Sequence, residues 1–120
     1  MVNTTVFLAR ILSGIRTDVI SESTHVAMGD DDTTPLISDT ALGNESDRNA
    51  RQEYTEGTSD VIISGFFNST ELSGVTLKEV GIFDASSSGN MASRNTFTDI
   101  SKTNSIEVWV DVEEQIDVTQ

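Results

Sequence analysis

The sequence predicts a mainly β protein, a single-domain antiparallel β-sandwich with a short N-terminal α-helix and long loops. Short runs of apolar and β-branched residues are separated by clusters of Ser, Gly, Asn and Asp, as strands and turns require. The length of 120 residues fits one domain, and neither a linker nor an internal repeat divides it. We therefore expect a helix and connector in residues 1–20 and the sandwich in residues 24–114.

The stretch Val75–Ala85 is the strand around which we expect the sandwich to form, because it is apolar and rich in β-branched residues. Val75 and Leu77 share one face of this strand. If the alternation is unbroken, Val80 and Ile82 lie on the opposite face. Either both faces are covered, or an irregularity turns all four side chains inward.

We favour the irregularity, a β-bulge with one extra residue near Lys78-Glu79. Gly81 follows at once and tolerates a bent backbone. The composition of Ser86–Met91 then predicts a turn into the next strand.

Apolar residues near the N-terminus recur at intervals of three and four, which is the spacing of one helix face. They are Leu8, Ile11, Leu12, Ile15 and Val19. We expect a helix at about Thr4–Ser13, and a connector or short strand at Ile15–Ile20. The helix either covers the core or docks on a neighbouring subunit, since Val6 and Phe7 are apolar on other faces.

A long loop is expected at Gly29–Asn44, where Pro35 forbids a central strand. Ser38 or Asp39 is a suitable cap for one helical turn at Thr40–Leu42. We expect Leu36 and Leu42 to contact the core from this loop.

Five further segments have strand-like composition. They are Thr24–Met28, Arg48–Thr55, Asp60–Asn68, Met91–Thr98 and Asn104–Val112, with a connector at Asp99–Thr103. Arg48–Thr55 alternates weakly and predicts a polar edge strand with Tyr54 as its one large anchor. Asp60–Asn68 is apolar on both faces, as a covered strand is.

The last strand alternates most clearly. Ile106, Val108, Val110 and Val112 form its core face, which leaves Trp109, the only tryptophan, among acids on the other face. The Trp109 ring either packs on cross-strand neighbours or contacts a partner subunit. We favour the partner contact, because tryptophan is enriched at interface hot spots.

The charge is strongly negative, with twenty acidic and seven basic residues and a formal charge of −13. Such a surface repels nucleic acid and anionic membranes. Its self-repulsion is screened in concentrated salt, where the Debye length falls to about 3 Å. The composition therefore favours a protein adapted to high salt, with an ordinary acidic protein as the alternative.

Catalytic and cofactor motifs are missing, and we expect neither enzymatic activity nor a cofactor. The sequence has no cysteine, and His25 is its only histidine. Asp30, Asp31 and Asp32 are weak candidates for a cation site, but they lack the alternating acids of a calcium loop. A solvated acidic loop is the favoured interpretation.

Four blocks of the sequence carry a family resemblance. They are Val26–Pro35, Ser38–Glu45, Leu77–Ala85 and Gly89–Arg94. In this order and spacing they resemble small tail or baseplate proteins, and tail-collar fibre attachment proteins, of tailed viruses. The chain departs from these proteins in its heavier acid load and in lacking a fibre shaft.

The resemblance implies a β-rich component of the virion tail, assembled in the host cytoplasm. It implies a homo-oligomer, trimer or hexamer, that binds other tail or baseplate proteins, without nucleic acid and without membrane insertion. Combined with the acidity, it suggests a virus of a halophilic, archaeal host. The expected interface residues are Phe7, Leu8, Ile11, Pro35, Leu36 and Trp109.

Two alternatives remain open from the sequence. The same fold would also suit a capsid decoration or turret protein of such a virus. A glycan-binding module is the third hypothesis, with Tyr54, Trp109 and the Asp30–Asp32 segment forming the site.

Overall fold

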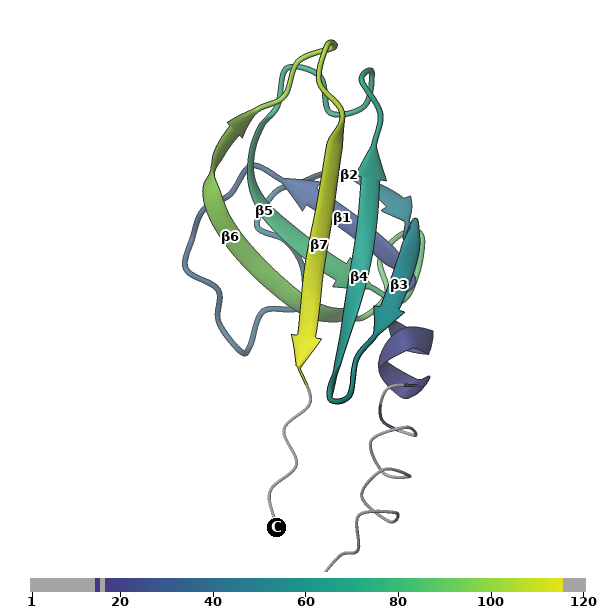
Figure 1. Cartoon of the computed structure of the whole chain (residues 1–120). Coiled ribbons are helices and arrows are strands. Elements are labelled where there is room, and N and C mark those ends of the chain that lie inside the picture. The colour runs from purple at the N-terminus through teal and green to yellow at the C-terminus, as the bar shows by residue number, and fades with distance from the viewer. Residues whose placement is uncertain (1–14, 16, 116–120) are drawn as a thin grey trace, which may run out of the picture.

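Seven antiparallel strands in two sheets make up the body of the protein in the computed structural model, which describes residue 15 and residues 17–115. The strands are β1 (His25–Gly29), β2 (Glu45–Ala50), β3 (Glu53–Glu56), β4 (Asp60–Phe67), β5 (Thr76–Phe83), β6 (Met91–Ser101) and β7 (Val108–Gln115). The four-stranded sheet has the order β2-β1-β5-β6, and the three-stranded sheet the order β3-β4-β7. The sheets face each other (Figure 1), so the predicted β-sandwich is confirmed.

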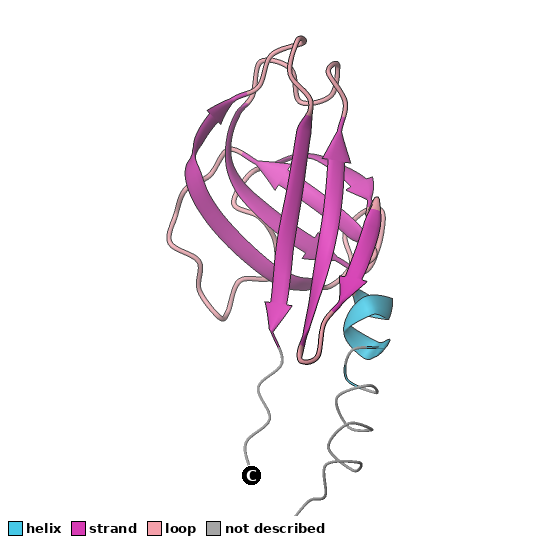
Figure 2. Ribbon diagram, viewed as in Figure 1, coloured by secondary structure: helices cyan, strands magenta, loops and turns pink. Residues whose placement is uncertain are grey.

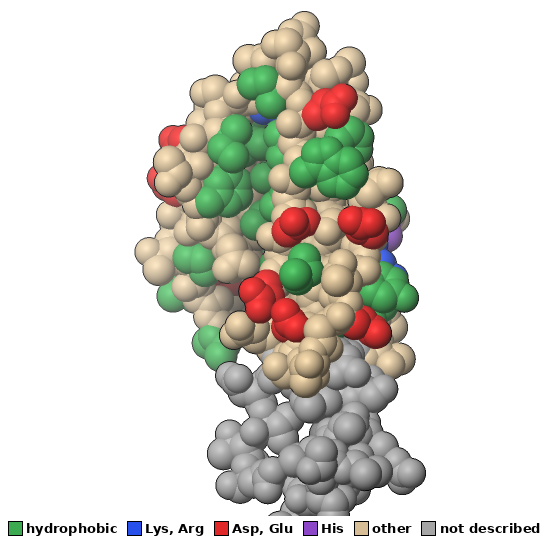
Figure 3. Space-filling view, in the orientation of Figure 1, with side chains coloured by type: hydrophobic (Ala, Val, Ile, Leu, Met, Phe, Trp, Pro, Cys, Tyr) green, Lys and Arg blue, Asp and Glu red, His purple; other side chains and the backbone are tan. Residues whose placement is uncertain are grey.

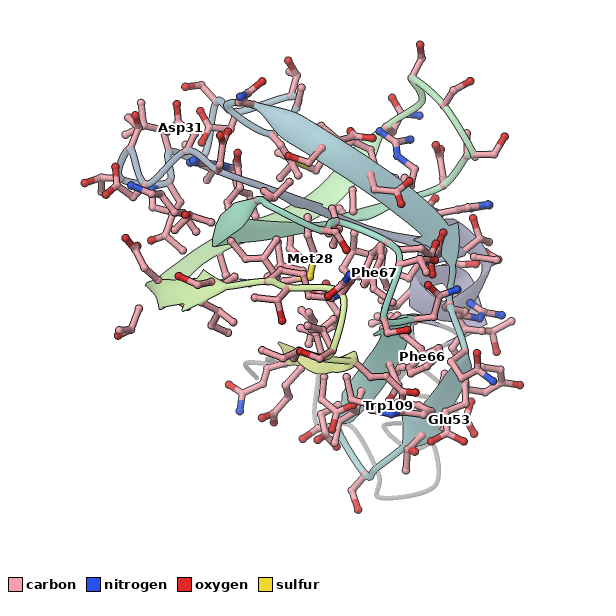
Figure 4. The ribbon with its side chains drawn as sticks, turned by 90° about the horizontal axis from the view of Figure 1, so that it is seen from above. Met28, Asp31, Glu53, Phe66, Phe67 and Trp109 are labelled. Atoms are coloured by element: carbon pink, nitrogen blue, oxygen red, sulfur yellow. The ribbon has the colours of Figure 1, made fainter. Side chains whose placement is uncertain are left out.

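The core lies between the sheets because each inner face carries β-branched and aromatic side chains. Its buried members are Val26, Met28, Val61, Ile63, Phe67, Leu72, Leu77, Val80, Ile82, Val108 and Val112. Figure 4 shows Met28 and Phe67 between the sheets, whereas Phe66 and Trp109 lie together farther out. The alternation predicted for the last strand is thus correct for Val108 and Val112. Ile106 precedes β7 and is exposed instead.

The predicted irregularity in the central strand is present, in a different form. The register between β5 and β6 shifts between Leu77, opposite Ile100, and Glu79, opposite Thr96. The surplus residues therefore lie on β6 and not on β5. As expected, all four apolar side chains of the central stretch contact the same core cluster: Val75, Leu77, Val80 and Ile82.

The second face of β5 is also buried, because residues 30–44 cover it. We call this segment the covering loop. It inserts Leu42 against Ala27 and Phe83 on the outer face of the four-stranded sheet. Gly81 makes room for this contact, since a Cβ there would stand 2.7 Å from Leu42 Cδ2. Gly81 thus serves packing and not the backbone bend that we expected.

The covering loop differs from the prediction in two details. No helical turn forms at residues 40–42; the chain turns at residues 37–38, where Asp39 accepts a hydrogen bond from the Leu36 amide at 2.9 Å. Leu36 is 61% exposed and does not contact the core. The Asp39 side chain thus caps a turn within the loop instead of the helical turn that we expected.

The polar strand expected at Arg48–Thr55 is two strands. β2 and β3 are edge strands of different sheets, and the chain crosses between them at residues 51–52. The Arg51 amide donates to Thr24 O at 2.9 Å, and the Gln52 amide donates to Ser64 O at 2.7 Å. Each amide is thus bonded to a different sheet, which fixes the crossing point.

Ile15 and residues 17–22 are helical (Figure 2), so the connector or strand predicted at Ile15–Ile20 is wrong. Val19 and Ile20 pack against the core cluster, and a helical backbone lets both side chains reach it. The helix predicted at Thr4–Ser13 lies outside the described residues. No helix in the described part of the chain is long and apolar enough to cross a membrane.

The two sheets touch closely at Gly65 of β4, which supplies a test of the sandwich. A Cβ at this position would lie 2.8 Å from Cβ of the buried Val26 on β1. We expect Gly65→Ala to lower the free energy of unfolding by about 1–3 kcal/mol through overpacking. Denaturant titration measures this loss.

Val26→Ala is the matched partner in a double-mutant cycle, because it removes Cγ1 and Cγ2, two of the three Val26 atoms that the new methyl group would approach within 3.0 Å. We expect the double variant to lose less unfolding free energy than the two single variants lose in sum. Strict additivity would contradict the close approach of the sheets at this point.

Candidate functional site

A buried carboxylate, Glu79 of β5, organises the covering loop. Its side chain is fully buried and accepts three backbone hydrogen bonds from the loop. Gly43 N and Asn44 N each lie 2.8 Å from a carboxylate oxygen, and Asp31 N lies at 3.1 Å. Both ends of the loop are therefore held by one side chain.

Arg94 of β6 is the counterion of Glu79, with Nε 2.9 Å from its Oε1. Its side chain is 4% exposed. The guanidinium also lies 3.3 Å from Asp39 Oδ2 and donates to Thr33 O at 2.9 Å. Burial opposes the positive charge, but the hydrogen bonds and charges of Glu79 and Asp39 together more than compensate, so the pKa of Arg94 is raised above its usual value.

The carboxylates of Asp30, Asp31 and Asp32 go to three different partners. Asp30 accepts from the Asn44 amide group, Asp31 lies near Arg94, and Asp32 is 3.9 Å from Lys78. Hydrogen bonds from Thr33 hold the pKa of Asp31 below its usual value. Residues 17–115 and residue 15 contain no cluster of three acidic or histidine side chains that would hold a metal ion.

The basic side chains of the described residues all serve internal contacts. Arg48 lies 3.6 Å above the Phe83 ring and donates to Ala85 O and Ser88 O. Lys102 is 1% exposed and donates to Ser69 O and Thr103 O. Arg51 donates to Ile20 O and Ser23 O.

Together with Arg94 and Lys78, these residues tie loops to the sheets. Acidic side chains therefore outnumber basic ones on the surface. Figure 3 shows many acidic and almost no basic groups on the face that it presents. The outward field of the described part is therefore negative.

An apolar groove of about 500 Å³ lies between the last residues of β6 and the first residues of β7. Six of its eight lining residues are apolar, and the eight are Met28, Phe97, Thr98, Asp99, Ile100, Val108, Trp109 and Val110. We call it the edge groove, because β6 and β7 each end a sheet. In Figure 3 hydrophobic side chains gather in the upper half of the face, around a hollow.

Trp109 combines the two roles that the sequence left open. Its ring lies 4.7 Å from that of Phe66, its direct neighbour across the β4–β7 ladder. The side chain nevertheless remains 59% exposed beside the edge groove. Cross-strand packing thus orients the ring and leaves most of its surface open to contact.

The predicted interface residues lie apart from one another. Pro35 and Leu36 form the tip of the covering loop and line a second hollow of about 350 Å³ with Ile37 and Met91. Trp109 belongs to the edge groove, and Phe7, Leu8 and Ile11 lie outside the described residues.

Sequence reasoning missed Phe97 and Ile100 as surface residues. Phe97 lies inside a segment predicted as an ordinary strand, and Ile100 was placed in a connector. Both line the edge groove because β6 runs on to Ser101. The sequence carried no signal for this, because only the strand order shows that β6 and β7 each end a sheet among the described strands.

The residues proposed for a glycan site do not converge. Asp31 contacts Arg94 and Glu79 at the four-stranded sheet, whereas Trp109 packs on Phe66 of the three-stranded sheet. Figure 4 shows Asp31 and Trp109 on opposite sides of the molecule. Tyr54 lies on β3, and β4 separates it from β7.

Removing the charge of Glu79 tests its role in holding the covering loop. In Glu79→Gln the buried Arg94 would keep only its longer ion pairs, to Asp31 at 3.4 Å and to Asp39 at 3.3 Å. We therefore expect the change to cost up to about 3–5 kcal/mol of unfolding free energy. Hydrogen exchange should accelerate at the amides of Asp31, Gly43 and Asn44. Glu113→Gln, on the exposed face of β7, is the control and should change stability by less than about 0.5 kcal/mol. Unchanged protection of the three amides in the Glu79 variant would contradict the assignment.

Comparison of the sequence with models of known protein families gives no match, and a search of curated proteins gives none either.

Proposed function

We propose that this protein is a non-enzymatic structural component of a tailed virus, located in the baseplate or fibre-attachment region of the tail. It works by assembling with copies of itself and with neighbouring tail proteins. The resemblance of four sequence blocks to such proteins supports the location. The observation that carries the assembly role is the edge groove, where an exposed tryptophan borders an apolar surface.

The second surface that supports assembly is the tip of the covering loop. Leu36 and Ile37 are largely exposed there, and the tip is held in place through Glu79 and Arg94. A rigidly held apolar tip loses little conformational entropy when it docks on a partner. Two apolar surfaces in different places allow one molecule to contact two neighbours.

The virion location has a direct test. Cryo-electron microscopy of purified particles, combined with labelling of a tagged chain, should place the protein at the tail. Labelling spread over the head would favour the alternative, a capsid decoration or turret protein. Recovery of the protein from infected cells but never from particles would rule out both locations.

Adaptation of this protein to concentrated salt is part of the same proposal. With the described basic groups held in internal contacts, self-repulsion among the acidic groups is left unbalanced. We expect the melting temperature to rise steeply from about 0.1 M to molar NaCl, as the Debye length shrinks from about 10 Å to about 3 Å. Thermal melts over this range, with matched ionic strengths of sulfate as a comparison, measure the effect. A melting temperature that does not change with salt would contradict the adaptation.

A further inference from the structure

The edge groove lies at one end of the sandwich only. β6 and β7 diverge there, but farther along they are joined, since Ser93 Oγ lies 2.6 Å from Glu114 Oε1. Neither strand has a hydrogen-bonded neighbour on this side among the described strands. The groove is thus an open apolar hollow of about 500 Å³, a size typical of binding sites.

The chain itself contains a segment whose composition suits this site. Residues 1–14 include eight apolar residues, a single charged residue, Arg10, and no acid. All twenty acidic residues and five of the seven basic ones lie from residue 17 onward. Residues 1–14 are therefore an apolar segment whose single charge is opposite in sign to that of the acidic body. Asp99, which also pairs with Lys78 at 3.7 Å, is the acidic residue that lines the groove.

The position of the groove favours a segment from another molecule. The helix at residues 17–22 stands at one end of the sandwich, near the β3–β4 turn (Figure 1). The edge groove lies toward the other end, where β6 finishes and β7 begins. The groove and the helix at residues 17–22 thus lie toward opposite ends of the sandwich, so residues 1–14 of the same chain would have to span its length to fill the groove, whereas those of a neighbouring copy would not.

We propose that the edge groove binds residues 1–14 of a second copy of this chain. The inference rests on the proposed assembly function and names the partner for one of its surfaces. The contact joins two different patches, so it is heterologous, and repetition of such contacts closes rings when the rotation between copies allows. Apolar side chains of the segment bury against Phe97, Ile100 and Trp109.

Complementation between two full-length variants tests the proposal. Leu8→Glu damages the segment and leaves the groove intact, whereas Ile100→Glu damages the groove and leaves the segment intact. We expect each variant alone to associate at least about 100-fold more weakly than the unchanged chain, because an unpaired carboxylate would be buried in the contact. Size-exclusion chromatography with light scattering at high NaCl gives the masses.

Mixing the two variants should restore one functional contact and give a one-to-one complex. Trp109, the sole tryptophan, reports on the groove directly, and its emission should shift to shorter wavelength in the mixture. Ile106→Glu is the control, because this residue is exposed to a similar degree as Ile100 but does not line the groove. The Ile106 variant should keep the mass of the unchanged chain.

Four results would overturn the proposal. A monomer whose Trp109 emission changes with Leu8→Glu means that the chain's own segment fills the groove. Loss of assembly with Ile100→Glu but not with Leu8→Glu means that another partner occupies it. An oligomer whose mass is unchanged by both substitutions assembles through a different surface. This result would contradict the groove contact but not the proposed function. A chain that is monomeric under all conditions and is never found in particles would remove the proposed function as well.

Discussion

The ion pair between Glu79 and Arg94 is the interaction on which the rest of the structure depends. A buried ion pair pays a large desolvation cost, and attraction between the charges alone rarely offsets it. Here three loop amides donate to Glu79, and loop oxygens from Thr33 and Asp39 accept from Arg94. The pair therefore gives a fifteen-residue segment without secondary structure a single position on the sheet. Without this ion pair, the covering loop would not be held on the sheet. Leu42 would then lose its contact with Phe83, and the outer face of β5 would be exposed.

This use of charge shapes the surface of the molecule. The basic side chains of the described part satisfy backbone oxygens or acidic groups within the chain, and Lys102 does so in almost complete burial. Acidic groups remain outside and repel acidic copies at long range. Association between copies must then come from apolar contacts at short range, which the edge groove and the loop tip can provide. Concentrated salt would favour such contacts by screening the repulsion.

Local composition was sufficient to predict the strands that alternate or are apolar throughout. β1, β4, β5 and the buried positions of β7 were all predicted, because burial of one or both faces leaves a periodic mark on the sequence. The boundary between β2 and β3 produces no such periodic pattern in the sequence. Both are polar edge strands, and only the hydrogen bonds of Arg51 and Gln52 to different sheets separate them. The edge groove was missed for the same reason, since no local pattern shows that Phe97 and Ile100 lie beside an uncovered sheet edge.

The sequence by itself determined the fold class, the negative charge and the segments that form the core, since each depends on composition or on short-range periodicity. It also indicated Trp109 as an exposed aromatic residue, because the alternation of β7 assigns it to the polar face. Only the tertiary structure decided what Glu79, Arg94 and Gly81 do. Their roles depend on residues 15 to 63 positions away in the chain, and no local pattern specifies contacts at that separation.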